Sequence, residues 1–288
     1  MRILILGHAG MLGSDLFLRL CASHDVTGKD TDDFDITSAV ACHDIISEVR
    51  PEIVINAAAY TDVDGCESNK QKCFSVNADG VKNVALACEG IKVVHFSTDY
   101  VFDGRKGIPY EEDDPCHPVN TYGRSKLEGE LFLKVFSNNF LLIRTAWLYG
   151  INGRNFVKTI AEAARTSKTI DVVDDQIGSP TYTWDLAAAV QLLIEGHHRG
   201  VFHVTNSGYC SWYEFAVKIL ECTGMEGVVV RPIKSDNLTR PASRPLYSVL
   251  SCEKFQKITG KSMRHWQNAL RDYIGAEAQR HKQIMGKG

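Results

Sequence analysis

Short apolar runs alternate with longer amphipathic segments through the first 145 residues, and this alternation most constrains the fold. The runs expected to form buried strands are Arg2–Leu6, Asp25–Gly28, Ile53–Asn56, Lys92–Phe96 and Phe140–Ile143. The segments expected to form helices between them are Met11–Cys21, Ala39–Val49, Cys73–Cys88 and Asn120–Phe136. Because parallel strands need crossover helices that cover both faces of the sheet, the pattern predicts an α/β fold with a Rossmann-type doubly wound parallel sheet.

The pattern after Arg144 is less regular. Expected helices are Phe156–Thr166, Asp185–Glu195, Ser211–Cys222 and Trp266–Ile274, and expected strands are Thr169–Val173, Val201–Val204 and Val228–Pro232. Ser211 and Glu214 have the spacing of a capping box. We predict a dinucleotide-binding domain over residues 1–145 whose sheet is completed by segments from about 155–204. A smaller α/β substrate-binding part over about 205–275 and a flexible tail over 276–288 would follow.

Composition excludes several classes of protein. The 288 residues include 32 basic and 35 acidic side chains, and a net charge of −3 argues against a nucleic-acid or membrane partner. No apolar run reaches the length of a membrane span, and the N-terminus lacks the long apolar region of a signal peptide. The nine cysteines show no Cys-x-x-Cys spacing. Reduced thiols in a cytoplasmic protein are therefore expected, without a disulfide framework or a zinc site.

A glycine-rich turn connects the first strand to the first helix. Its glycines are Gly7, Gly10 and Gly13, and Met11 and Leu12 lie between the last two. Glycines let backbone amides approach a pyrophosphate, and the helix N-terminus adds unpaired N–H groups and a positive dipole end. A plain strand–helix turn would look similar, but the position at the start of the chain favours dinucleotide binding.

Polar and small residues follow three further strands. Asp30, near the end of the second strand, can bind the adenosine ribose and disfavours a 2′-phosphate, so NADH is favoured over NADPH, although Lys29 weakens the argument. The small side chains within Asn56–Tyr60 either leave room for a cofactor or allow a helix to pack tightly against the strand. The Thr98 hydroxyl, after the fourth strand, either holds a substrate oxygen or caps a loop.

Tyr122 and Lys126 are four residues apart, and of the ten tyrosines only Tyr122 has a lysine at this offset. On a helix the two side chains share one face. A free phenol has a pKa near 10, and a neighbouring ammonium lowers it toward the working range. Such a pair can transfer a proton to or from a carbonyl or alcohol oxygen, which is half of a hydride-transfer reaction.

Six segments together resemble the extended short-chain dehydrogenase/reductase superfamily and, within it, the dTDP-4-dehydrorhamnose reductases. They are Ile55–Asp64, Ser97–Gly104, Tyr122–Glu130, Arg144–Gly150, Asp175–Thr181 and Ala242–Pro245. The resemblance extends to about Ile274. It implies NAD(P)H-dependent reduction of the 4-keto group of dTDP-4-dehydro-L-rhamnose to dTDP-L-rhamnose, in nucleotide-sugar biosynthesis.

The resemblance also implies roles for individual residues. The catalytic threonine, tyrosine and lysine fall on Thr98, Tyr122 and Lys126. Asp99 and Trp147 match positions that touch the sugar nucleotide, and Arg244 either binds its phosphates or is a surface arginine. The resemblance implies cofactor contacts at Gly10, Met11, Leu12, Asp30, Asp35, Ile36, Ala59, Tyr60 and Thr61, and Tyr122 and Lys126 contact the cofactor as well.

One departure and two alternatives accompany the resemblance. Some members hold magnesium between acidic side chains at a dimer interface; Asp15 can match one of them, but Trp184 stands where another acid is expected, so no magnesium is expected. The protein is expected to be a monomer or a homodimer.

One alternative function is that of an NDP-sugar epimerase or dehydratase. Dehydratases, however, carry an acidic pair after the threonine, whereas Asp99 is followed by Tyr100 here. The other is a non-catalytic regulatory subunit, such as the methionine adenosyltransferase β-subunit.

Overall fold

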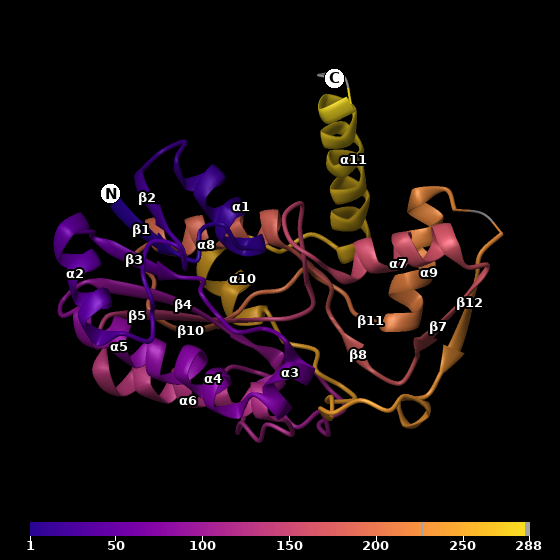
Figure 1. Ribbon diagram of the computed structural model, residues 1–288, viewed down its shortest axis with the longest axis horizontal. Coiled ribbons are helices and arrows are strands. Elements are labelled where there is room, and N and C mark those ends of the chain that lie inside the picture. The colour runs from indigo at the N-terminus through magenta and orange to yellow at the C-terminus, as the bar shows by residue number, and fades with distance from the viewer. Residues whose placement is uncertain (226, 286–288) are drawn as a thin grey trace.

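A six-stranded parallel sheet forms the centre of the larger part of the protein (Figure 1), and the computed structural model describes residues 1–225 and 227–285. The strand order is β10-β5-β4-β3-β1-β2. The strands are β1 (Arg2–Leu6), β2 (Asp25–Lys29), β3 (Ile53–Asn56), β4 (Lys92–Thr98), β5 (Phe140–Thr145) and β10 (Gly200–His203). The order reverses direction between β1 and β3, as in doubly wound nucleotide-binding folds, where ligands bind beyond the carboxyl ends of the strands. The predicted fold class is confirmed.

Helices bury both faces of the sheet because residues of each strand point alternately to opposite sides. Ile3 and Ile5 face α1 (Met11–Leu20), α8 (Thr183–Glu195) and α10 (Glu253–Thr259). Leu4 and Leu6 face the other layer, which contains α2 (Ala39–Val49), α5 (Gly80–Ala87) and α6 (Thr121–Phe136).

A smaller part with its own aromatic core lies beside the sheet (right in Figure 1). Its helices are α7 (Phe156–Thr166), α9 (Trp212–Thr223) and α11 (Trp266–Met285). Its strand pairs are β7 (Thr169–Val173) with β12 (Val229–Ile233), β8 (Ile177–Gly178) with β11 (Cys210–Ser211), and β6 (Leu148–Tyr149) with β9 (Thr181–Tyr182). The capping box of Ser211 and Glu214 is confirmed. The elements α7 and β7 belong to this smaller part, whereas the later elements α8 and β10 belong to the larger part around the six-stranded sheet. The chain therefore passes between the two parts more than once.

Several element bounds differ from those expected. The helix expected over Cys73–Cys88 is α4 (Lys70–Phe74), a π-helix η1 (Ser75–Asp79) and α5 in succession. Two helices were not expected: α3 (Val63–Ser68), capped by the Asp62 side chain, and α10. Short 3₁₀ helices are η2 (Asp99–Val101) and η3 (Ser235–Asn237).

The last helix, α11, continues well past its expected end at Ile274. The flexibility of residues 276–288 stays a prediction, and residues 286–288 lie outside the described ones. In the described part of the chain, no helix is both long and apolar enough to cross a membrane.

Candidate active site

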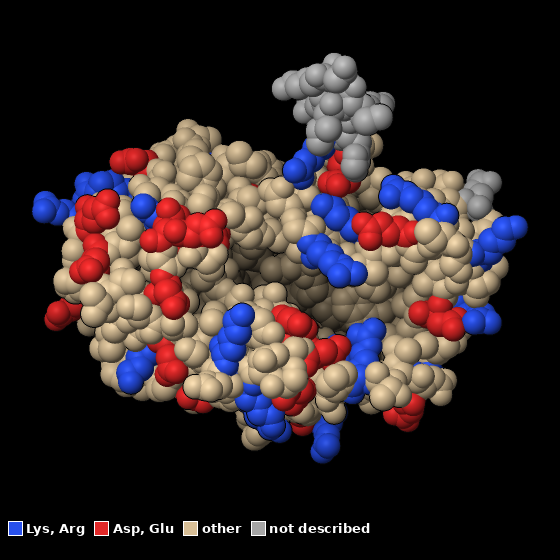
Figure 2. All heavy atoms as spheres, viewed as in Figure 1, with Lys and Arg blue, Asp and Glu red and all other residues tan. Residues whose placement is uncertain are grey.

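The candidate residues converge on the carboxyl ends of the central strands, and Figure 2 shows a hollow between the two parts of the protein on this side. The glycine turn follows β1, the Asn56–Tyr60 loop follows β3, and Thr98 ends β4. Tyr122 and Lys126 lie in α6, which packs against β4 and β5. The alternation of strands and helices thus brings these four separate segments to one edge of the sheet.

The glycine turn has no room for side chains at two of its positions. Gly7 has φ +80°, and a Cβ there would lie 2.8 Å from the backbone nitrogen of Ala58. A Cβ on Gly13 would collide with the carbonyl oxygen of Gly7. Gly10 is the N-cap of α1, and no side chain caps this helix. The turn therefore packs closely on the β3 loop and presents an uncapped helix N-terminus, which fits the phosphates of a dinucleotide.

Asp30 joins the end of β2 to this turn. Its Oδ2 accepts a hydrogen bond of 2.9 Å from the backbone N–H of Ala9, and its Oδ1 accepts one of 2.8 Å from that of Thr31. Burial alone would raise the pKa of Asp30, but these hydrogen bonds outweigh it and hold the pKa below the ordinary value. The carboxylate is thus anionic at the place where an adenosine ribose would lie.

The remaining predicted cofactor contacts lie on two neighbouring loops. Asp35 is exposed and accepts two hydrogen bonds from Thr37, whereas Ile36 is buried in the core beside α5. Ala59 and Thr61 are exposed in the loop after β3, with Tyr60 between them. The backbone N–H of Tyr60 donates to Asn77 Oδ1 at 2.8 Å, and its carbonyl accepts from Asn77 Nδ2 at 2.9 Å.

The catalytic candidates meet where β4 faces α6. Thr98 Oγ1 donates to Asp99 Oδ1 at 3.0 Å. The Thr98 hydroxyl also lies near the Tyr122 phenol and lowers the pKa of that phenol. Burial is the largest influence on Tyr122, and together with Asp99 it raises the phenol's pKa above the ordinary value. This direction is opposite to the one that the Tyr–Lys spacing predicts. The Tyr122 phenol is therefore protonated at neutral pH.

Lys126 lies deeper than the prediction assumed. It is 3% exposed, and its Nζ donates a 2.6 Å hydrogen bond to the carbonyl oxygen of Phe96. Burial lowers its pKa to about 8, against the opposing effect of Glu130 one turn further along α6. The ammonium is the main ionic form at neutral pH, and it lies next to the strand end where a nicotinamide ribose is expected.

Buried polar atoms without a partner gather at the same strand ends. Among the described residues, Asn56 Nδ2, Ser97 Oγ and Thr145 Oγ1 are buried and make no hydrogen bond. They stand at the carboxyl ends of β3, β4 and β5, respectively. Since buried polar groups normally have partners, these atoms fit a site that a polar ligand completes. The residues present therefore suit a dinucleotide.

The predicted substrate residues are held by neighbours that sequence reasoning missed. Asp99 is buried, and Ser248 Oγ donates to its Oδ2 at 2.5 Å. Burial raises the pKa of Asp99 to about 6, although the bonds from Ser248 and Thr98 oppose this shift. Ser248 follows the Ala242–Pro245 stretch by three residues, but a lone serine in a loop gives no sequence signal. The tertiary fold alone brings it to the site.

Trp147 stacks on Trp212 of α9, with ring centroids 3.5 Å apart and planes 6° apart. One face of its indole is therefore covered by protein. Its φ of +49° is unusual for a residue other than glycine, and such backbone strain is frequent at functional sites. The stacked pair forms a wall on the side of the smaller part.

Arg244 is already paired in this structure. Its two terminal nitrogens donate to both carboxylate oxygens of Asp64, at 2.8 and 2.7 Å, and Nη1 also donates to the carbonyl of Ala242. The Asn120 side chain, which caps α6, donates to the carbonyl of Ser243 at 2.7 Å. The arginine loop is thus fastened to the N-terminus of the helix that carries Tyr122, and its contact with a nucleotide stays a prediction.

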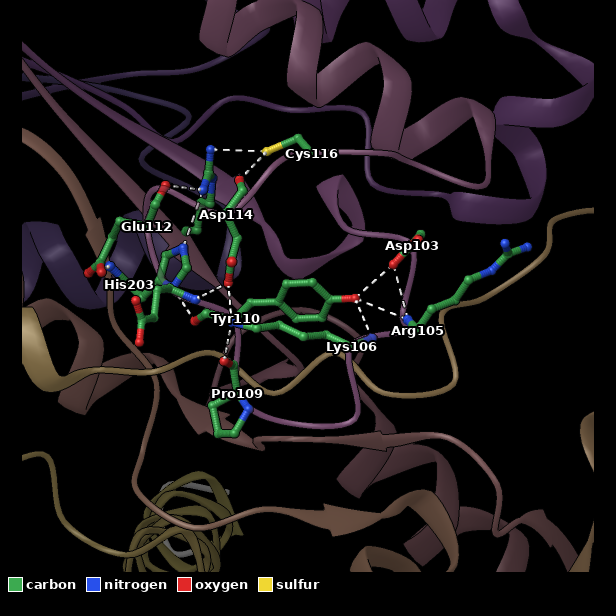
Figure 3. A network of polar contacts seen from close by, with 11 residues as sticks. Asp103, Arg105, Lys106, Pro109, Tyr110, Glu112, Asp114, Cys116 and His203 are labelled. Atoms are coloured by element: carbon green, nitrogen blue, oxygen red, sulfur yellow. Dashed lines mark hydrogen bonds and ion pairs between the residues drawn. The ribbon is translucent and has the colours of Figure 1, made fainter.

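The loop between Thr98 and Tyr122 is anchored by a polar network (Figure 3). The Tyr110 hydroxyl donates to Asp103 at 2.8 Å, and Lys106 forms an ion pair with Asp114. His203 Nδ1 donates to the Tyr110 carbonyl at 3.0 Å, since a carbonyl can only accept. Burial lowers the pKa of His203 to about 3, so the ring stays neutral. The loop thus has a fixed path over β5 and β10.

The predicted absence of a magnesium site stays untested, but Asp15 has a partner. It is buried on α1, and the Thr183 hydroxyl at the start of α8 donates to its Oδ2. Within residues 1–225 and 227–285, no group of three or more His, Cys, Asp or Glu side chains is arranged to hold a metal ion.

The fold and the site define an NAD(P)-dependent oxidoreductase of the extended short-chain dehydrogenase/reductase type. A sequence profile of the RmlD substrate binding domain family matches residues 1–279, so the chain belongs to this family. Its relatives include SpsK, a spore coat polysaccharide biosynthesis protein of Bacillus subtilis (strain 168), at 41% identity over 95% of this chain and 96% of that protein. The dTDP-4-keto-6-deoxy-D-glucose reductase of Streptomyces niveus is 37% identical over 93% of this chain and 95% of that protein.

Two solved structures are also similar. The dTDP-4-dehydrorhamnose reductase of Clostridium acetobutylicum superposes with a TM-score of 0.93 at 42% identity, covering 96% of this chain and 99% of that one. The enzyme of the same name from Bacillus anthracis, solved with NADP, gives a TM-score of 0.92 at 39% identity, covering 95% and 98%. The predicted membership of this reductase family is confirmed. As a member of this family, the protein is a dTDP-sugar 4-ketoreductase that uses NAD(P)H.

Proposed function

We propose that this protein reduces the 4-keto group of dTDP-4-dehydro-L-rhamnose to give dTDP-L-rhamnose. The observation that carries the proposal is the meeting of Thr98 and Tyr122 at the end of β4, beside Lys126 and the glycine turn. When bound, NAD(P)H supplies the hydride to C4. A cytoplasmic location follows from the need for this reduced cofactor.

The protein's own residues handle the proton. The Tyr122 phenol, which burial keeps protonated, donates to the C4 oxygen as negative charge develops there. When the substrate is bound, the single proton of the Thr98 hydroxyl can turn from Asp99 Oδ1 to the same oxygen and hold that oxygen in reach of the phenol. The Lys126 ammonium, anchored by the Phe96 carbonyl, supplies positive charge and orients the nicotinamide ribose.

The sugar nucleotide lies on the side of the smaller part. Asp99 is positioned by Ser248 and Thr98 to accept a hydrogen bond from a sugar hydroxyl. The half-buried indole of Trp147, stacked on Trp212, offers apolar surface to the deoxy-sugar ring. Arg244 supports this side by holding its loop against Asp64.

NADH is the favoured cofactor. Three acids follow Asp30 closely, Asp32, Asp33 and Asp35, and all three are exposed. Their charge disfavours the dianionic 2′-phosphate of NADPH. The NADP complex of the Bacillus anthracis relative shows that the family also admits the phosphorylated cofactor.

The deciding assay measures oxidation of NADH and NADPH by purified protein with dTDP-4-dehydro-L-rhamnose, with its UDP counterpart and with dTDP-4-keto-6-deoxy-D-glucose. We expect the highest kcat/KM with NADH and the first substrate. Preference for the third substrate would instead assign the activity named for the Streptomyces niveus relative. Sugar conversion without net cofactor oxidation would indicate an epimerase, and binding without turnover a regulatory subunit.

The oligomeric state, monomer or homodimer, is best determined on the same preparation by light scattering.

A further inference from the structure

The loop from Gly150 to Arg154, between β6 and α7, lies against the first turn of α1; we call it the strap. A Cβ on Gly150 would come within 3.0 Å of Met11 Cγ, and one on Gly153 within 3.6 Å of Met11 Cβ. Asn152 Nδ2 donates a 2.7 Å hydrogen bond to Ser14 Oγ, which itself donates to the carbonyl of Met11 at 3.1 Å. The strap therefore holds the residue that opens the uncapped helix of the dinucleotide turn.

Two cations fasten the strap from the opposite side. Lys158 Nζ, from α7, donates to the carbonyl oxygens of Ile151 at 2.6 Å and Gly153 at 3.3 Å. Arg280 Nη1, from α11, donates to the carbonyl oxygen of Ile151 at 3.1 Å and to Asn152 Oδ1 at 3.0 Å. Asn152 is thus held between Ser14 and Arg280.

The position of α11 makes this contact possible. Its first turns are anchored in the aromatic core by Trp266, Leu270 and Tyr273. Beyond them the helix projects away from the smaller part (Figure 1), and there Glu277 pairs with Lys158 at 3.5 Å. Among the described side chains of this part of α11, Arg280 thus contacts the strap, and Glu277 contacts Lys158, which also holds the strap.

We propose that α11 positions the strap over the dinucleotide turn and thereby sets the affinity for NAD(P)H, with Arg280 as the positioning residue. The inference rests on the proposed function, since it assumes that the turn binds a dinucleotide. If the strap is released, Met11 and the first turn of α1 lose a packed neighbour, and water reaches that side of the turn. The pyrophosphate contacts then become weaker, while the proton chemistry at Tyr122 is unaffected.

The test is the dissociation constant of NADH, measured by fluorescence titration of the full chain and of Arg280→Ala. We expect roughly three- to tenfold weaker binding, because the variant loses the two exposed hydrogen bonds that the charged Arg280 side chain donates. The cofactor KM should rise in parallel, with kcat at saturating NADH within about twofold of the wild type. Asn152→Ala, which removes the contacts with both Ser14 and Arg280, should weaken NADH binding at least as much.

Two further variants separate positioning from general stability. Arg280→Lys keeps a charged donor and should recover most of the affinity. Arg271→Ala removes a guanidinium of the same helix that bonds only to Asn268 among the described residues, and should bind NADH as the wild type does. An unchanged NADH dissociation constant in Arg280→Ala, or an equal loss of NADH affinity in Arg271→Ala, would overturn this inference and leave the proposed function intact. If the wild type binds neither NADH nor NADPH, the proposed function fails and the inference fails with it.

Discussion

The phenol of Tyr122 illustrates how burial can outweigh residue spacing. The four-residue offset correctly predicts that Tyr122 and Lys126 share α6, but not the direction of the tyrosine's pKa shift. Loss of water around the phenol and the nearby Asp99 carboxylate both disfavour phenolate. Lys126 is turned toward the Phe96 carbonyl instead. A protonated tyrosine suits the reductive direction, in which the enzyme must deliver a proton.

Tyr122→Phe should lower kcat by on the order of a hundredfold or more, because it removes the proton donor. Its NADH dissociation constant should stay near the wild-type value. Steady-state rates and a fluorescence titration on one preparation check both statements. Near-wild-type turnover would mean that another group supplies the proton.

Asp99→Asn should change the pH dependence of stability in a defined window. Burial raises the Asp99 pKa from 3.8 to about 6 in the folded protein, so the folded state holds this proton more tightly than the unfolded state. Stability from this group is therefore present below pH 4 and is lost as the pH rises through 6. The wild type should lose free energy of unfolding relative to Asp99→Asn between about pH 4 and 6. Urea denaturation at several pH values measures the difference, and a flat difference curve would refute the assignment.

At the scale of elements, the π-helix η1 explains how the cofactor loop is held. Asn77 is buried within this turn, and π-helical turns are often found at functional sites. Asn77 bonds both backbone groups of Tyr60, and its Nδ2 also donates to Ser125 Oγ at 3.1 Å. One buried amide thus couples the loop after β3 to the turn between Tyr122 and Lys126. The apolar pattern of the segment indicated a helix but contained no sign of this turn.

Asn77→Ala should lower the free energy of unfolding by about 1–3 kcal/mol, because it leaves both Tyr60 backbone groups without their partner. It should also raise the KM for NADH, since the Tyr60 loop is a predicted cofactor contact. Asn138→Ala, at an exposed asparagine after α6, is the control and should change neither quantity. Equal behaviour of the two variants would show that the Asn77 contacts are dispensable.

At the scale of the whole molecule, a buried ion pair joins the sheet, the catalytic helix and the long loop. Arg144 of β5 donates to both carboxylate oxygens of Glu130 on α6, at 2.9 and 2.8 Å, and both side chains are almost fully buried. The same guanidinium reaches the Glu112 carbonyl and Cys116 Sγ. It also contacts His203 of β10, which lies beside Tyr110 in the network of Figure 3.

Arg144→Met should destabilise the protein by about 3–5 kcal/mol, because the buried Glu130 carboxylate loses its bidentate partner and keeps only the partly exposed Lys134 at 3.7 Å. Arg144→Met combined with Glu130→Met should be markedly more stable than the single variant. Chemical denaturation of the wild type, both single variants and the double variant completes the cycle. Additive effects would show that the pair is not coupled.

Local sequence patterns were sufficient for most of the central sheet. The apolar runs Arg2–Leu6 and Ile53–Asn56 coincide with β1 and β3, whose residues are almost all buried, and the amphipathic segment Ala39–Val49 coincides with α2. The Ser211 capping box is equally local. Short elements such as β6, β8 and α3 escaped prediction, since two to six residues carry no measurable period.

The sequence by itself predicted the class of the fold, the dinucleotide turn and the candidates Thr98, Tyr122 and Lys126, because these depend on local patterns and on the resemblance of separate segments. The tertiary structure decided the partners: Ser248 on Asp99, Trp212 on Trp147, Asp64 on Arg244 and Arg280 on the strap. Each of these pairs joins residues at least 65 positions apart in the chain. Such contacts, and the burial that sets the pKa of Tyr122, exist only once the chain has folded.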